Sequence, residues 1–574
     1  MRTWRALLAG LLSVSCLALL GTSTVLGNNL GRDRDPVVLS GTDLPDLIGL
    51  HPDSIVAFRW DSTAFDWSQI PVQVDERAVV DFGAIYDTTA SGFTVLTYTD
   101  TSTFTGADPN PLFDTDDELA FRARDAGDTQ PPAIVGPGSR LARVNSMWPP
   151  GTTPAPAVEV TLTDPLTFAV GYVYLFRSDG HLDPRAGVAP IDYQFVLLSG
   201  HYKSTYNPRA GPNPENSRVT TANYSIHFAD RWIRDETLIT AGGATGVDIL
   251  DRHKNLFGPG NCSRSENTFS AGEGALIVNR AGPVRALRGY LGANSGPTTW
   301  RLHKFYEARE DISTALRVHP IPGLMDYFDY SPAASGMTYS NSWNPAGVPI
   351  DGSPDAVAPG PPQWEMVSGP QGTMVVTSLI DTDIPGLSLG SYYSDDDTPP
   401  TTQCTGDSWE YGASGLWIDQ GLPNTDPALV AQYGGQLYTL TETRIHGFDA
   451  PGKDWLYAQQ VDGQSRNPLA TQAVEWWPPS GVEPFARPFG GLALSPNPAR
   501  GPVRMRLSLA REARVVIRVF DAAGRMILTL AEGPWSAGAH DFRWDASGLA
   551  PGVYLVRATI AGRDEATVRL ALIR

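Results

Sequence analysis

The 574-residue sequence lacks the motifs that mark several common kinds of enzyme. It contains only nine histidines and three cysteines, and no HExxH motif, P-loop or helix-opening GxGxxG. Positive charge is also scarce, because 43 lysines and arginines face 62 acidic residues and give a formal net charge of −19. This balance argues against a general nucleic-acid-binding protein, so we expect no nucleic-acid partner.

Long apolar runs are missing after the first 27 residues. In that first segment Arg2 and Arg5 precede the apolar stretch 6–20, and small residues then lead to Gly27. This order of charge and hydrophobicity predicts a secretory signal peptide over residues 1–27. No later stretch approaches the roughly 18 apolar residues that a membrane-spanning helix needs, so we expect no transmembrane segment after signal cleavage.

Removal of the predicted signal peptide leaves two cysteines, Cys262 and Cys404. An even number in an exported chain permits one disulfide, and both residues lie in loop sequence rich in glycine, serine and threonine. Neither has the neighbouring cysteine or histidine spacing of a zinc site. We predict a Cys262–Cys404 disulfide, with two buried free thiols as the alternative.

Glycine and proline are plentiful, at 57 and 48 residues, without the period of a collagen. Together with many short apolar runs, this favours a turn-rich all-β fold. We expect a large β-sandwich body and a small immunoglobulin-like sandwich at the C-terminus. The predicted divisions are a signal peptide (1–27), an N-terminal β region (28–150), the body (151–477), a Pro/Gly-rich linker (478–490) and a C-terminal domain (491–574).

The C-terminal domain carries the most specific pattern. Val503, Met505 and Leu507 alternate with polar residues, as in a half-buried strand, and turn sequences separate several such segments. The motifs LSPNPARGPVRMRLSL, VVIRVFDAAGRMILTL and SAGAHDFRWDASGLAPGVYLVRAT resemble the C-terminal sorting domain of type IX secretion cargo and the related FlgD-type immunoglobulin-like module. The resemblance implies contact with the secretion machinery and a secreted or outer-surface location. An ordinary C-terminal sandwich is the alternative.

Three segments of the body resemble the mutarotase-like β-supersandwich of several polysaccharide lyases. They are VNRAGPVRALRGYLG (278–292), WRLHKFYEAREDISTALRVHP (300–320) and WEMVSGPQGTMVV (364–376). The resemblance implies a supersandwich-like body and an extracellular polysaccharide as partner.

Candidate catalytic residues lie in two places. If 300–309 is one strand, its alternate residues share a face: Arg301, His303, Phe305, Glu307 and Arg309. Arginine can neutralise a uronate carboxylate and histidine or tyrosine can move a proton, which is the chemistry of a β-eliminating lyase. His201 and Tyr202 follow an apolar strand, and His227 could join them. The alternative is a solvated strand face with ion pairs, together with structural histidines.

An acidic loop offers a possible metal site. Asp114, Asp116 and Asp117 are dense in the hard oxygen ligands that Ca²⁺ takes. A structural Ca²⁺ is one interpretation and a solvated acidic turn is the other. No other cofactor is expected.

The sequence therefore predicts an exported protein whose body acts on or binds polysaccharide. Whether it is an enzyme stays open, and a non-catalytic surface, adhesion or structural protein is the alternative. Tryptophans in turn-rich sequence are candidates for stacking on sugar rings: Trp364, Trp409, Trp417, Trp476 and Trp477.

Overall fold

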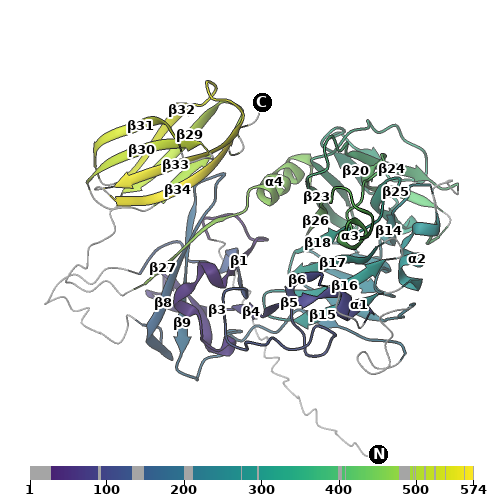
Figure 1. Ribbon diagram of the computed structural model, residues 1–574, viewed down its shortest axis with the longest axis horizontal. Helices are drawn as coiled ribbons and strands as arrows, with labels where there is room; N and C mark the ends of the chain where they lie inside the picture. The colour runs from purple at the N-terminus through teal and green to yellow at the C-terminus, as the bar shows by residue number, and fades with distance from the viewer. Residues whose placement is uncertain are drawn as a thin grey trace, which may run out of the picture.

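The computed structural model describes residues 28–572 with several gaps. Not described within that range are 88–91, 132–147, 200–210, 261, 273, 294–295, 399–403, 408, 477–490, 496, 498, 510–511, 522–524, 537 and 561–562. The described chain forms an N-terminal unit, a larger body and a C-terminal sandwich, and their main sheets are antiparallel (Figure 1). The predicted all-β sandwich class is confirmed. The predicted signal peptide and the whole predicted linker, 478–490, lie outside the described residues.

The N-terminal unit is a sandwich of two sheets around an aliphatic core. The larger sheet has the order β27 (Ala470–Glu475), β8 (Thr152–Thr163), β9 (Val170–Ser178), β2 (Ile55–Asp61) and β3 (Asp66–Ile70). The smaller sheet has the order β1 (Pro36–Ser40), β7 (Glu118–Arg122) and β4 (Gln73–Asp75). The unit therefore includes β8 and β9, which follow residue 150. It also includes β27, which comes after the strands of the body in the sequence. Strand patterns in a sequence show where strands occur but not which strands pair, so the predicted division at residue 150 stays a prediction.

A short hairpin connects this unit to the body. Strands β5 (Arg77–Asp81) and β6 (Thr94–Tyr98) flank helix α1 (Phe82–Asp87), and buried apolar residues from them pack on β15–β17 of the body. Figure 1 shows β5, β6 and α1 beside β15–β17. The two units thus share a continuous apolar contact.

The body is built on a nine-stranded antiparallel sheet. Its order is β15 (Ala275–Ala281), β16 (Ala286–Ala293), β17 (Gly296–Tyr306), β18 (Arg309–Ala315), β26 (Leu440–Asp449), β23 (Gly372–Thr382), β22 (Trp364–Gly369), β20 (Thr338–Asn341) and β21 (Val348–Pro349). Helix α4 (Trp455–Arg466) covers β22 and β23, and the Asp454 side chain caps it by accepting from the backbone N–H of Tyr457. The short helix α3 (Pro427–Tyr433) begins after the cap residue Asp426.

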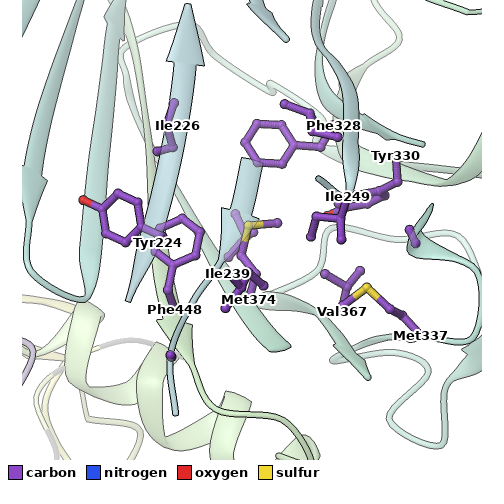
Figure 2. Packing of buried hydrophobic residues seen from close by; sticks show 14 of the residues in the cluster. Tyr224, Ile226, Ile239, Ile249, Phe328, Tyr330, Met337, Val367, Met374 and Phe448 are labelled. Carbon is purple, nitrogen blue, oxygen red and sulfur yellow. The ribbon is translucent and has the colours of Figure 1, made fainter. Parts of the chain in front are cut away.

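Two four-stranded sheets complete the body. One has the order β14 (Leu250–Leu256), β19 (Leu324–Tyr330), β25 (Glu410–Ile418) and β24 (Gly390–Asp396), with helix α2 (Glu266–Ala271) beside β14. The other has the order β10 (Asp192–Gln194), β11 (Ser217–Thr220), β12 (Tyr224–Phe228) and β13 (Arg234–Ile239). Their buried side chains meet those of the large sheet in one apolar cluster, where Tyr224 stacks on Phe448 at a centroid distance of 4.2 Å (Figure 2).

The C-terminal sandwich has a separate core. Its sheets are β28 (Gly491–Ser495), β29 (Pro502–Leu509) and β32 (Gly538–Asp545), and β31 (Met526–Trp535), β30 (Ala513–Asp521), β33 (Gly552–Ile560) and β34 (Arg563–Leu572). The alternating residues Val503, Met505 and Leu507 are each fully buried, as their spacing predicts. All members of this core come from residues 492–572.

Candidate functional site

The predicted polar row of β17 lies inside the body. Arg301 and His303 are each only 1% exposed, and both side chains project between the sheets. His303 Nδ1 lies 3.0 Å from Glu310 Oε1, and its Nε2 accepts from the Tyr290 hydroxyl at 3.0 Å. A polymer in solution cannot reach either side chain in this arrangement. Their catalytic role stays a prediction.

Asp326 binds one group of buried polar side chains in the body. Its carboxylate accepts hydrogen bonds from Arg301 at 2.7 Å, Arg444 at 2.6 Å and His253 at 2.7 Å. Burial raises the pKa of Asp326, but the hydrogen bond from His253 and the charges of Arg301 and Arg444 lower it more, so the carboxyl stays ionised. The same burial lowers the pKa of His253 to about 4, which leaves the imidazole neutral at pH 7.

Glu310 binds a second group of buried polar side chains. It pairs with Arg234 at 2.6 Å and binds His303, while His446 Nδ1 lies 3.8 Å away. Burial raises the pKa of Glu310, but Arg234 and His303 lower it below its ordinary value. Burial also lowers the pKa of His303 to about 3, so a neutral ring donates from Nδ1 to the Glu310 carboxylate.

A third acid, Glu442, lies beside the Asp326 group, near Arg301 and Arg444. It neighbours Arg444 and His446 along the same face of β26, and it is 2% exposed. Burial and the negative charge of Asp326 raise the pKa of Glu442 to about 8, so this carboxyl is protonated at pH 7. Sequence reasoning passed over Glu442, Arg444 and His446, although their i, i+2 spacing in TETRIHGFD is the same signal that marked Arg301 and His303.

Three other candidate residues, Glu307, Arg309 and His227, do not join this cluster. The predicted single strand over 300–309 is a hairpin, because β17 ends at Tyr306. Glu307 lies in the turn and pairs with Arg124, and Arg309 begins β18 and binds Asp311. This part of the prediction was wrong. His227 lies on the other face of β12 from Phe228 and binds Asp235 and Asn216. His201 and Tyr202 lie outside the described residues.

The predicted metal ligands Asp114, Asp116 and Asp117 do converge. One carboxylate oxygen of each lies within 4.8 Å of the others, and Asp117 is fully buried. Burial raises the pKa of Asp116 and of Asp117 to about 6. Asp117 accepts from the backbone N–H groups of Arg77 and Asp114, so the loop also has an internal structural role. Calcium binding here stays a prediction.

The predicted disulfide is present. Cys262 and Cys404 are bonded, with Cα atoms 5.1 Å apart. The bond fixes the loop 404–407 beside α2, where the Thr405 hydroxyl contacts Glu266. The tryptophans that are candidates for sugar stacking differ in exposure. Trp364 and Trp476 are buried, Trp417 is half-buried, and Trp409 is 42% exposed. Trp477 lies outside the described residues.

A polar cleft opens where the N-terminal unit meets the body. Its volume is about 540 Å³. At its floor Gln73 accepts from the backbone N–H groups of Val284 and Arg285, and Arg285 pairs with Asp75 at 2.8 Å. These contacts join β4 to the turn between β15 and β16. Other lining residues with polar side chains are Asp53, Asp183, Arg185 and Arg280.

The cleft walls combine donors and acceptors. Asp183 and Arg185 come from the loop after β9, and Arg280 comes from β15. Neither arginine forms an ion pair with another residue in the described part of the chain. Little in the sequence points to this site, because its residues come from four separate segments. One of them, 280–283, lies in the segment 278–292, but no spacing links it to the other three.

A comparison with known protein families identifies the C-terminal domain. Residues 493–571 match the secretion system C-terminal sorting domain. The predicted type IX sorting domain is therefore confirmed, and the protein is secreted or carried on the outer surface. The likeness to the FlgD-type module stays a prediction. No helix in the described chain is long and apolar enough to span a membrane.

Comparisons of the whole chain are much weaker. No curated protein sequence matches it. Among solved structures, a polysaccharide lyase is 7% identical over 62% of this chain and 47% of its own, with a TM-score of 0.23. An alpha-mannosidase from Enterococcus faecalis is 10% identical over 90% and 55%, with a TM-score of 0.36. A xanthan lyase from Paenibacillus is 9% identical over 70% and 46%, with a TM-score of 0.19.

These likenesses carry no conclusion on substrate or activity. The chain spans about half the length of the polysaccharide lyase and mannosidase structures, at 47% and 55%.

Proposed function

We propose that this exported protein binds polysaccharide, and that the cleft between its N-terminal unit and its body holds the saccharide. The sorting domain brings the protein to the outside of the cell, where such polymers occur. The observation that carries the proposal is the cleft itself, whose volume of about 540 Å³ lies in the usual range of ligand sites.

The chemistry of the cleft suits a sugar. Each sugar hydroxyl both donates and accepts, and the walls offer carboxylates at Asp53 and Asp183 beside guanidinium groups at Arg185 and Arg280. A uronate would in addition find a bidentate partner in either arginine. The floor is held by Gln73 and by buried ion pairs, so the walls are positioned before a ligand arrives.

Binding is better supported than β-elimination at Arg301 and His303. Both side chains are closed off from solvent; Arg301 Nη2 donates to Asp326, and both ring nitrogens of His303 are engaged with Glu310 and Tyr290. An imidazole whose pKa is about 3 is also a weak base at neutral pH. We therefore assign these residues a structural role in the proposal.

The test is a glycan array probed with the full chain and with Arg280→Gln. Arg280 lines the cleft, and losing a charged hydrogen-bond donor costs about tenfold in affinity. The matched control is Arg514→Gln, which removes an exposed arginine of the C-terminal sandwich.

We expect glycan binding by the wild type and the control, and about tenfold weaker binding by Arg280→Gln. Ultraviolet absorbance should show no unsaturated uronate. A blank array, or equal binding by all three proteins, would overturn the proposal.

A further inference from the structure

The body contains a completely buried lysine. Lys254 is one of only four lysines in the chain, and its side chain is 0% exposed. It lies on β14 and its Nζ contacts the Oδ2 atom of Asp329 on β19, whose side chain is also 0% exposed. In the register of these antiparallel strands Arg252 faces Asp329 and Lys254 faces Tyr327, so the two side chains meet diagonally across one ladder.

Apolar side chains pack beside this pair, and the buried carboxyl groups of Glu266 and Glu410 also lie near it. Leu256, Met325, Tyr327, Tyr392 and Ala413 form a buried cluster on the same part of the sheet. Both side chains are enclosed away from solvent, and the Lys254 Nζ atom is held against the Asp329 carboxyl.

Two further acids border the pair. One carboxylate oxygen each of Asp251, Asp329 and Asp407 lies within 4.8 Å of the others. Asp407 sits in the disulfide-anchored loop and donates its backbone N–H to Asp251. Burial raises the pKa of Asp251, so its carboxyl is able to carry a proton near the Asp329 carboxylate. Asp251 and Asp407 are half-buried, which leaves a route to solvent.

We propose that Lys254 and Asp329 join in an intramolecular isopeptide bond. A proton passes from the Lys254 ammonium to the carboxylates, and Asp251 relays it to the Asp329 carboxyl. The free amine attacks Cγ of Asp329, one C–N bond forms, one C–O bond breaks, and one water leaves. The ammonium and carboxylate together supply all the atoms of that water, so no oxidant or other reactant is required.

The chain contains a natural control for this reaction. Lys453 also pairs with an aspartate, since its Nζ lies 3.5 Å from Asp449, but both side chains are partly exposed. Solvent reaches both side chains of that pair, whereas Lys254 and Asp329 are closed off from it. The isopeptide bond is thus expected at Lys254 and not at Lys453.

The test is the mass of the purified full chain after denaturation and reduction. We expect the measured mass to be lower by one water than the mass calculated from the sequence, starting at the measured N-terminus. We also expect a fragment spectrum in which the peptides that contain Lys254 and Asp329 are joined. Lys254→Met and Asp329→Ala should restore the full mass, whereas Lys453→Met should keep the deficit. Asp251→Asn should slow the appearance of the deficit in freshly folded protein.

The wild-type measurement decides the question even if a variant fails to fold. A full mass, or a linear peptide with a free Lys254 amine, would overturn the bond and leave a buried ion pair. A deficit that maps to another residue, such as a succinimide, would overturn it as well. Metal binding by the three carboxylates together with a full mass would show a cation site in place of the bond.

Discussion

The body and the C-terminal sandwich are both antiparallel β-sandwiches, but they place charge in opposite positions. In the C-terminal sandwich the core residues Val503 and Leu507 are aliphatic, and the ion pair Arg506–Asp541 lies at the surface. In the body Arg301, Asp326 and their ionisable partners are buried between the sheets, next to apolar side chains. Alternation of polar and apolar residues therefore assigns side chains to two faces of a strand, but it does not say which face is buried.

Removal of the terminal sandwich should give the largest effect. Because its core contains no residue of the body, deletion of 491–574 is expected to leave the body folded. The truncated chain should remain in the periplasm, since the sorting domain is lost. Cell fractionation and surface proteolysis measure this. Normal surface display of the truncated chain would contradict the sorting role.

The second-largest expected effect is on stability, and it comes from replacing one buried and one exposed aspartate. Asp326→Ala leaves Arg301 and Arg444 buried without their carboxylate, which is expected to lower the free energy of unfolding by about 3–5 kcal/mol. The matched change Asp541→Ala breaks an exposed pair and should have no measurable effect. Denaturant titration followed by tryptophan fluorescence compares them. Equal small effects would show that the charged interior contributes little.

A smaller effect concerns pH. The pKa of Glu442 is about 8 in the folded body against an ordinary 4.5, so the folded state holds a proton that the unfolded state releases between these values. This group therefore lowers the free energy of unfolding as pH rises from about 4.5 to 8.

Glu442→Gln should remove that loss and be more stable than the wild type at pH 9, with little difference at pH 4. Glu532→Gln, on the exposed surface of the C-terminal sandwich, is the control and should match the wild type at both values. Thermal melts across this range measure the difference. A constant difference between the Glu442 variant and the wild type at all pH values would contradict the assignment.

Much of the fold could be predicted from the sequence. The all-β class followed from turn residues and short apolar runs, and the C-terminal sandwich followed from strict alternation in segments such as Val503–Leu507. The Cys262–Cys404 bond followed from cysteine parity in an exported chain. These are local or compositional signals. The pairing of β2 with β9 could not be predicted in this way, because it joins segments far apart in the sequence.

The candidate site was much less predictable. Arg301 and His303 were chosen correctly as sharing a face, but the sequence could not show that β14 and β19 cover that face. The cleft was not predicted at all, because Gln73, Asp183, Arg185 and Arg280 meet only when two units pack together. Residues that meet only when two units pack together have no characteristic spacing in the sequence, so a site of this kind cannot be recognised from spacing.

Hydrogen exchange with and without a glycan selected from the array tests the central claim most directly, because bound ligand slows exchange at the backbone it covers. The account predicts slower exchange in 72–75, 180–185 and 280–283, which line the cleft, and no change in 300–306 of β17. Protection of 300–306 with no protection of the cleft segments would contradict the account, because the ligand would then enter the polar interior of the body.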